Sequence, residues 1–223
     1  VLTKTYAVSL EDGTEINVTV SDEPWRGDVN VADWEAVTES LLLRAACRKW
    51  GRPAPIAETE RLFLRELSMK DLPALRTLSL PAKESRYLGG DWEGLKDEFF
   101  LRRYIETQYA FFDYGLWALF RRAGEVREAQ FLGLVGFSPE EPPELGYALR
   151  PEARGQGYAT EAGLAALRYA ETELGFTAAK IRVVPENRAG CAVAAKIEEQ
   201  WNRAGGAPQC RLFVKRESSV YKG

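Results

Sequence analysis

The stretch from Glu144 to Glu161 limits the possible folds of this chain more than any other stretch. It begins as a strand with alternating apolar positions, breaks at a proline, turns through Arg154-Gly155-Gln156-Gly157 and enters a long helical pattern. The amides of such a turn and of the first helical turn have no intrahelical partner, and glycine lets a phosphate approach them closely. A strand, a glycine turn and a helix start in this order predict an anion-binding site.

Two other interpretations of the glycine turn follow from the residues alone. In the first, the glycines only close a loop between strand and helix. In the second, the turn is a dinucleotide fingerprint, but Gly155 to Thr160 reads G-x-G-x-x-T and is followed by no clean acidic candidate at a strand end. A P-loop is excluded because the chain lacks the Gly-Lys-Ser/Thr sequence at this turn.

Length and charge restrict the class of protein and its partners. The chain has 223 residues, which suits one large domain or a standard domain with a small addition. Its net charge is −3 and its pI is about 5.4, which argues against nucleic acid or an anionic membrane as the main partner. No apolar run approaches the roughly 20 residues that a membrane span needs.

The chain contains no histidine, and this restricts its chemistry. Ser-His-Asp and Cys-His nucleophile systems and HExxH zinc sites are excluded, so proton transfer must use carboxylates, Tyr, Lys, Cys, water or backbone. The three cysteines, Cys47, Cys191 and Cys210, are far apart and lack metal-ligand spacing. They predict buried or incidental thiols, no metal and a reducing cytoplasm. The start at Val1 carries no signal-peptide pattern and no initiator Met, so it need not be the natural start.

The first 55 residues are expected to form a unit of their own. Thr5–Val20 predicts a hairpin around an Asp-Gly turn, Val31–Trp50 predicts a helix, and Gly51–Pro55 is a linker rich in helix breakers. We therefore predict an appended hairpin-plus-helix unit over residues 1–55 and a main domain over residues 56–223.

The main domain is predicted to be α/β, with a mixed, largely antiparallel sheet and a βαβ crossover after the glycine turn. Ser68 is expected to cap the first helix of this domain. The predicted elements are the strand Glu58–Arg65, the helices Met69–Leu80 and Leu95–Phe112, the strands Tyr114–Arg121, Ala129–Phe137 and Leu145–Leu149, the helix Gly157–Leu174, the strand Lys180–Val184, the helix Ala189–Trp201, and the strands Arg211–Val214 and Ser219–Tyr221.

One further interpretation of the glycine turn comes from resemblance to a family. Arg154-x-x-Gly157-x-Ala159 matches the acyl-CoA motif, Arg/Gln-x-x-Gly-x-Gly/Ala, of the GNAT N-acetyltransferases. The flanking segments resemble, in order and spacing, the branch that acetylates ribosomal-protein N-termini. These segments are Glu58–Arg65, Glu144–Tyr147, Tyr158–Ala162 and Asn187, within a resemblance that covers roughly Glu58 to Trp201.

The resemblance implies a GNAT fold in which two neighbouring strands splay apart and hold acetyl-CoA between them. It places the CoA pyrophosphate on the amides of Gly155–Thr160 and the pantetheine arm against the backbone of Ala148 and Leu149, where the strand leaves Lys180–Val184. The implied cofactor-binding residues are Ala148, Leu149, Arg154, Gly155, Gln156, Gly157, Tyr158, Ala159, Thr160 and Asn187. No metal is implied.

The same resemblance implies direct attack of an amine on the thioester in a ternary complex. Glu144 is the candidate base, directly or through a water; the alternative is an ordinary solvated carboxylate. Glu186 is a weaker candidate, and Glu161 fits a first-turn helix residue better than a catalyst. Asn187 either contacts the cofactor arm or caps a helix, and Tyr147 either donates a proton or packs.

Departures from the family pattern leave alternatives open. Gly190 stands where the family often has Ser, and Ala195 stands near the position of the Tyr that serves many members as acid. We expect an acetyltransferase acting on a primary amine, either a protein N-terminus or a small molecule, with a homodimer retained as one option. The alternative is a catalytically weak acyl-CoA-binding module, and a third hypothesis is an interaction role for the N-terminal unit. The aromatic residues of Tyr104–Trp117 belong to the core or line the acceptor site.

Overall fold

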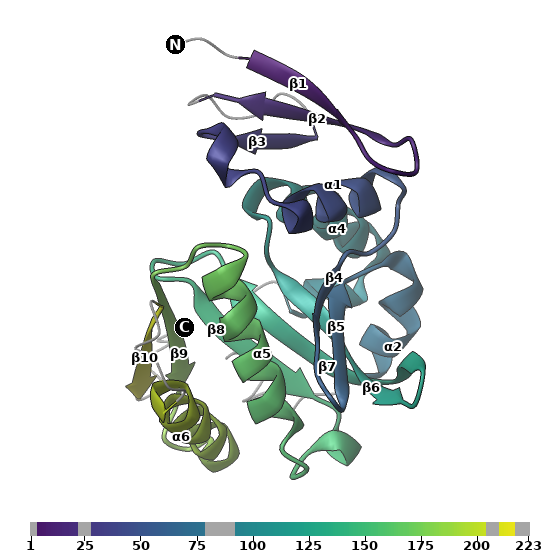
Figure 1. The fold of residues 1–223 in the computed structure, drawn as a ribbon. Helices are drawn as coiled ribbons and strands as arrows, with labels where there is room; N and C mark the ends of the chain where they lie inside the picture. The colour runs from purple at the N-terminus through teal and green to yellow at the C-terminus, as the bar shows by residue number, and fades with distance from the viewer. Residues whose placement is uncertain (1–3, 22–27, 79–91, 204–209, 217–223) are drawn as a thin grey trace. The chain divides into compact units, whose positions relative to one another are not determined.

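A computed structural model of the chain describes residues 4–21, 28–78, 92–203 and 210–216. The chain divides into two compact units, Val1–Pro55 and Ile56–Gly223, whose helices and strands are labelled in Figure 1. Each unit has its own cluster of buried apolar side chains. Within the described ranges, no helix has the length and apolar character needed to cross a membrane.

The smaller unit contains a three-stranded sheet and one α-helix. Strands β1 (Lys4–Ser9) and β2 (Glu15–Val20) form the predicted antiparallel hairpin, whose turn contains Gly13 at φ +84°. A third strand, β3 (Val29–Val31), pairs parallel with β2 and was not predicted. The core of this unit consists of Ile16, Val18, Val29, Ala45 and Ala46.

The helix predicted over Val31–Trp50 is shorter than expected. The residues after β3 form a 3-10 turn, η1 (Trp34–Ala36), and helix α1 (Glu39–Lys49) begins later. Two polar side chains cause this, because each accepts a hydrogen bond from a backbone amide three residues ahead: Asp33 from Ala36 and Thr38 from Leu41.

A seven-stranded mixed sheet forms the centre of the larger unit, in the order β10-β9-β8-β7-β6-β5-β4. The strands from β5 to β8 pair antiparallel, whereas β8 with β9 and β9 with β10 pair parallel. The predicted mixed sheet with a crossover after the glycine turn is confirmed. The bounds are β4 (Pro55–Glu58), β5 (Leu62–Glu66), β6 (Leu116–Ala123), β7 (Val126–Ser138), β8 (Glu144–Leu149), β9 (Ala178–Val183) and β10 (Arg211–Arg216).

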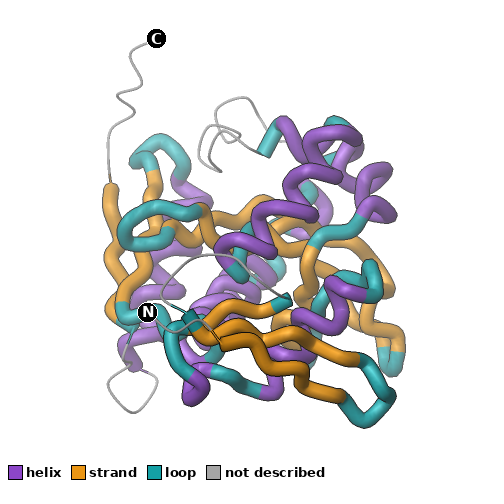
Figure 2. The backbone as a smooth tube through the Cα atoms, turned by 90° about the horizontal axis from the view of Figure 1, so that it is seen from above, coloured by secondary structure: helices purple, strands orange, loops and turns teal. Residues whose placement is uncertain are grey.

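Helices α5 (Tyr158–Thr172) and α6 (Arg188–Arg203) connect β8, β9 and β10 and pack against each other (Figure 1). Figure 2 shows the strands as a twisted layer with helices packed against it. Gly163 allows the close contact of the two helices, because a Cβ there would lie 2.6 Å from Cδ1 of Ile197. The remaining helical elements are η2 (Met69–Asp71), α2 (Leu72–Thr77), η3 (Gly94–Lys96), α4 (Glu98–Phe112) and η4 (Pro151–Ala153).

Two predicted elements at the start of the larger unit differ from the observed ones. The strand predicted over Glu58–Arg65 is interrupted between β4 and β5, because Thr59 exchanges two hydrogen bonds of 2.9 Å with Leu62 and forms a turn. The helix predicted over Met69–Leu80 starts as the 3-10 turn η2 and continues as α2 to Thr77. Its last two predicted residues, and the strand predicted over Ser219–Tyr221, lie outside the described residues.

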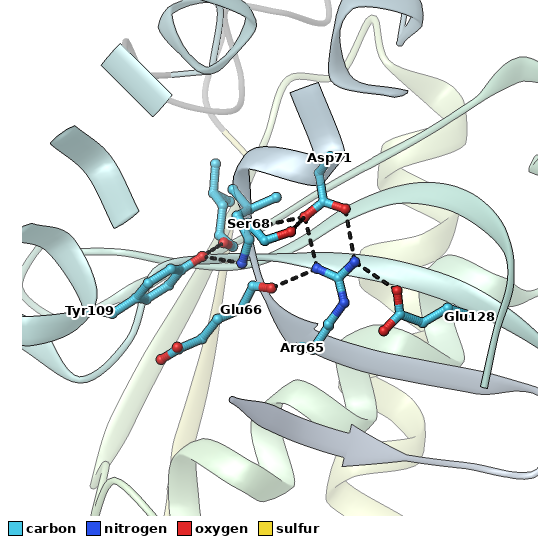
Figure 3. A network of polar contacts seen from close by, with 8 residues as sticks. Arg65, Glu66, Ser68, Asp71, Tyr109 and Glu128 are labelled. Carbon is cyan, nitrogen blue, oxygen red and sulfur yellow. Dashed lines mark hydrogen bonds and ion pairs between the residues drawn. The ribbon is translucent and has the colours of Figure 1, made fainter. Parts of the chain in front are cut away.

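A buried group of polar side chains connects β5, η2 and β7, and we call it the Arg65 network (Figure 3). Both terminal nitrogens of Arg65 donate to the Asp71 carboxylate at 2.8 Å, and Nη2 also donates to Glu128 at 2.8 Å. Asp71 in turn accepts from the Ser68 amide at 2.7 Å, as part of the capping box that begins η2. Beside this network, the Tyr109 hydroxyl from α4 accepts from the Leu67 amide at 2.9 Å and donates to the carbonyl of Leu116 at 2.5 Å.

The aromatic residues between Tyr104 and Trp117 divide between core and surface. Tyr104, Tyr109 and Trp117 are buried, which agrees with the core interpretation. Phe111, by contrast, is 61% exposed at the end of α4.

Candidate functional site

Strands β8 and β9 separate almost as soon as they meet. Along these two strands, all of whose residues are described, the register contains one Cα pair, Glu144 with Lys180. The Lys180 amide also donates to the carbonyl of Pro143 at 2.9 Å. Beyond this point a cavity of about 340 Å³ opens between the strands and extends to the start of α5. The splayed strand pair expected of the fold is present.

Most of the residues that were predicted from sequence to bind the cofactor line this cavity. Its lining comes from β8, the glycine turn, the first turn of α5, β9 and the first turns of α6. Nine of the ten predicted cofactor-binding residues line it: Ala148, Leu149, Arg154, Gly155, Gly157, Tyr158, Ala159, Thr160 and Asn187. The tenth, Gln156, has its side chain elsewhere, where Nε2 donates to the carbonyl of Glu152 at 2.8 Å.

The glycine turn presents a row of backbone amides to the cavity. Gly155 and Gly157 have φ values of +74° and +81°, a region that favours glycine. The first bond of α5 runs from the Glu161 amide to the carbonyl of Gly157 at 3.1 Å, so the three amides before it have no intrahelical acceptor. Among the described residues, no backbone carbonyl outside helices and strands accepts from amides 155–160. The turn therefore has the geometry of an anion site.

Two residues between β4 and β5, Thr59 and Arg61, hold this turn, and we call them the Arg61 brace. The Glu161 carboxylate accepts from Arg61 Nε at 2.7 Å and from Thr59 Oγ1 at 2.6 Å. Arg61 also donates to the carbonyl of Gln156 at 3.1 Å, and its guanidinium lies 4.8 Å from the ring centre of Tyr158. Glu161 thus supports the turn, in agreement with its interpretation as a first-turn residue. Its partner Arg61 was not found from sequence, because it lies 100 residues away.

The backbone of β8 offers alternate residues to the cavity. The carbonyl of Pro143 points to β9, whereas the amide of Arg150 donates to the carbonyl of Leu132 on β7 at 2.8 Å. Since successive residues of a strand point to opposite neighbours, the amide and carbonyl of Tyr147 and Leu149 face the cavity.

Ala148 has the opposite orientation. Its carbonyl approaches β7 so closely that a Cβ at Gly133 would lie 1.9 Å from the oxygen. The backbone of Ala148 is therefore not available to the cavity, although the residue lines it. The carbonyl of Leu149 already accepts from Arg154 Nε at 3.1 Å. The expected backbone contact thus shifts from Ala148 to Tyr147 and to the amide of Leu149.

At the start of α6, Asn187 caps the helix and lies close to Gly190. Asn187 Oδ1 accepts from the Gly190 amide at 2.9 Å, which is the predicted capping role. A Cβ at Gly190 would lie 2.6 Å from Asn187 Nδ2, so a larger residue there would displace the Asn187 side chain from its present position. The Tyr147 hydroxyl donates to the carbonyl of Gly190 at 3.1 Å, and burial raises the pKa of this phenol well above its ordinary value. Tyr147 therefore keeps its proton and connects β8 to α6.

The other end of the splay carries four charged residues that we call the Glu144 cluster: Glu140, Glu144, Lys180 and Arg182. Arg182 Nη2 lies 2.7 Å from Glu144 Oε2 and 2.8 Å from Glu140 Oε2, and Lys180 Nζ lies 2.6 Å from the same Glu140 oxygen. Arg182 lines the cavity, and Glu144 lies directly behind it.

Glu144 is not the solvated carboxylate of the alternative interpretation, because only 9% of it is exposed. Burial raises the pKa of Glu144 above its ordinary value, and the positive charge of Arg182 offsets this in part. The weaker candidate, Glu186, is exposed and does not line the cavity. The partners of Glu144 were not predicted from sequence, although charged residues at alternate positions of a buried strand, Lys180 and Arg182, were a signal for them.

Three comparisons with known proteins bear on this arrangement. A family model described as an acetyltransferase (GNAT) domain matches residues 61–198. The crystal structure of an acetyltransferase from Agrobacterium tumefaciens is similar at 31% sequence identity, over 63% of this chain and 80% of that one, with a TM-score of 0.50. RimL, a ribosomal L7/L12 alpha-N-protein acetyltransferase, shares the fold at 20% identity, over 66% and 81% of the two chains, with a TM-score of 0.50. A search of curated proteins found no match.

Proposed function

The chain belongs to the GNAT acetyltransferase family, and we propose that it transfers an acetyl group from acetyl-CoA to a primary amine. The observation that carries this proposal is the cavity between β8 and β9, with backbone amides at one end and, at the other, Arg182 in contact with the buried Glu144 carboxylate. The acceptor is either a protein N-terminus or a small amine.

The cavity has a volume typical of small-molecule sites, which supports the proposal. Its volume of about 340 Å³ lies within the range of roughly 300–1,000 Å³ typical of small-molecule sites. In the proposed complex, the amides of Gly155–Thr160 bind the pyrophosphate at the N-terminus of α5, where the helix field favours an anion. The pantetheine amides pair with the backbone of Tyr147 and with the amide of Leu149, as an added strand would.

The proposed chemistry uses direct attack. The neutral amine attacks the thioester carbon, a C–N bond forms, and the C–S bond breaks to release the CoA thiolate. A cavity-facing backbone amide of β8 that the pantetheine arm leaves free stabilises the negative charge that develops on the thioester oxygen. Glu144 takes the proton of the amine through a water, because the carboxylate lies behind Arg182 and does not line the cavity.

A second candidate function is a catalytically weak acyl-CoA-binding module. Two observations favour it: Ala195 stands near the position of the family's common acid, and the Tyr147 hydroxyl is already engaged with a carbonyl. A thiolate can leave near neutral pH without a dedicated acid, so these observations are compatible with transfer as well.

We further propose that residues 1–55 form an appended domain and that the protein acts in the cytoplasm.

Calorimetry with acetyl-CoA tests the cofactor part of the proposal. Gly157→Glu puts a carboxylate into the anion site and forces a side chain into a left-handed conformation, so binding should be lost. Gly124→Glu is the matched control, because Gly124 has φ +56° in the β6–β7 turn, open space around it and no part in the cavity. Its affinity should equal that of the unaltered protein.

A CoA-release assay with a panel of peptides and small amines separates the two candidate functions. Release with any acceptor supports transfer, and binding without release with every acceptor favours the binding module. If the unaltered protein does not bind acetyl-CoA, both functions are wrong.

A further inference from the structure

Arg182 is the residue through which the Glu144 carboxylate meets the cavity. It stands on β9, two positions after Lys180, which is the register partner of Glu144 on β8. A diagonal position of this kind is within reach of a long side chain, and Arg182 Nη2 lies 2.7 Å from Glu144 Oε2. Since Arg182 also lines the cavity, the Glu144 carboxylate and the space for the thioester share this side chain.

The position of Glu144 is unfavourable for a charged group. It is nearly buried at the point where two strands converge, and burial disfavours its ionised form. A base must be ionised to accept a proton. A neighbouring cation that remains charged at every physiological pH meets this need, and a guanidinium is such a cation.

The charges that face Glu144 act in opposite directions. Arg182 and Lys180 from β9 favour the ionised carboxylate, whereas Glu140, from the segment between β7 and β8, disfavours it. Glu140 also competes for the cation, because its Oε2 lies 2.8 Å from the same Arg182 nitrogen. Glu140 is itself held by Lys180 at 2.6 Å.

We propose that Arg182 is a positioning residue for Glu144: it keeps the carboxylate charged and oriented at the end of the cavity, and Glu140 weakens this hold by sharing the guanidinium. The inference rests on the proposed function, since it takes Glu144 as the base. It adds two residues, Arg182 and Glu140, whose effects on the reaction have opposite signs.

Three variants test the inference through the pH dependence of kcat/KM. If Arg182 and Glu140 had only a structural role, their substitution would not shift this pH dependence in opposite directions. In Arg182→Met the loss of positive charge should shift the acid limb of kcat/KM to higher pH, by about one unit. In Glu140→Gln the limb should shift to lower pH, because a negative charge beside Glu144 is removed. Arg182→Lys keeps the charge and should restore most of the position of the limb.

Carbon-13 NMR of the glutamate side chains supplies a second readout that needs no acetyl transfer. The Glu144 signal is identified as the one missing from Glu144→Gln. The pKa of Glu144 should rise in Arg182→Met and fall in Glu140→Gln. The acid limb of kcat/KM should shift in the same direction in each variant. This also separates the titration of Glu144 from that of the acceptor amine.

The possible failures are distinguishable. If the Glu144 titration is the same in all three variants, the inference is wrong, whatever the activity. If the titration moves and the acid limb does not, Glu144 is not the base, and the inference falls while acetyl transfer stands. If the unaltered protein transfers acetyl to no acceptor, the proposed function fails and takes the inference with it.

Discussion

The Arg65 network and the Glu144 cluster are two groups of charged side chains on one sheet, each with two buried members, and they differ in what surrounds them. Arg65 has a 6% exposed side chain, lies 4.5 Å from the ring centre of Phe120 and gives both terminal nitrogens to Asp71. Arg182 divides one nitrogen between two carboxylates and borders an open cavity. The Arg65–Asp71 pair of the first arrangement is buried, whereas the second arrangement borders a space that can hold a ligand.

The pKa shifts of the two groups agree with this difference. Burial works against the charge of Arg65, yet its hydrogen bonds to Asp71 and Glu128 raise its pKa further above the ordinary value. For Glu144, burial raises the pKa, and Arg182 offsets only part of that effect. The Arg65 guanidinium is held by two carboxylates and serves stability, whereas a buried carboxylate whose charge is only partly compensated can accept a proton.

The largest expected effect is on stability, in the Arg65 network. Arg65→Met leaves the Asp71 carboxylate buried at 5% side-chain exposure without its cation, and removing one partner of such a pair typically costs about 3–5 kcal/mol. Urea unfolding should report this loss in the free energy of unfolding. The double variant Arg65→Met/Asp71→Asn should recover part of it, and a loss below about 1 kcal/mol in the single variant would contradict the comparison.

The second effect is on turnover, in the Glu144 cluster. Glu144→Gln removes the proposed base with almost no change in volume, so kcat should fall about 10²-fold or more, while acetyl-CoA affinity stays nearly the same. Steady-state kinetics and calorimetry measure the two quantities. An unchanged kcat would remove Glu144 as the base and make the cluster a second structural network.

The smallest effects are expected from the most exposed carboxylate of each group, Glu128 in the Arg65 network and Glu140 in the Glu144 cluster. Glu128 and Glu140 have similar side-chain exposures, 44% and 43%, so each conversion to Gln should cost less than about 1 kcal/mol of stability. Thermal unfolding should therefore give nearly equal melting temperatures. Only the Glu140 variant should alter the pH dependence of the reaction; the same alteration in Glu128→Gln would erase the distinction between the two groups.

The parts of the fold that could be predicted from sequence depend on local patterns. The alternating apolar residues of β8, the glycines at 155 and 157 and the small residues of α5 specify a strand, a turn and a helix within a short stretch, and all three are present. The family motif predicted that β8 and β9 splay apart, and the single register pair between these strands confirms it. The role of Asn187 was left open between two functions, and its cap bond establishes one of them.

The remaining features depend on contacts between distant residues or on competition between weak local signals. The Arg61 brace and the bond from Arg182 to Glu140 join residues that lie 100 and 42 positions apart, and no local pattern encodes such pairs. The helix of the smaller unit was predicted too long because apolar periodicity continues through Asp33 and Thr38, whose side chains bind backbone amides instead. Strand β3 has three residues and is too short to show alternation.

The single pair between Glu144 and Lys180 also has a mechanical consequence. Across the splay, the backbone hydrogen bonds that make most sheets cooperative are missing, so β9, α6 and β10 are joined to the rest of the sheet mainly by helix packing and by the Glu144 cluster. A ligand that hydrogen-bonds along the open edge would close this seam. Its binding free energy would then contribute to the cohesion of the whole sheet, as the addition of a missing strand would.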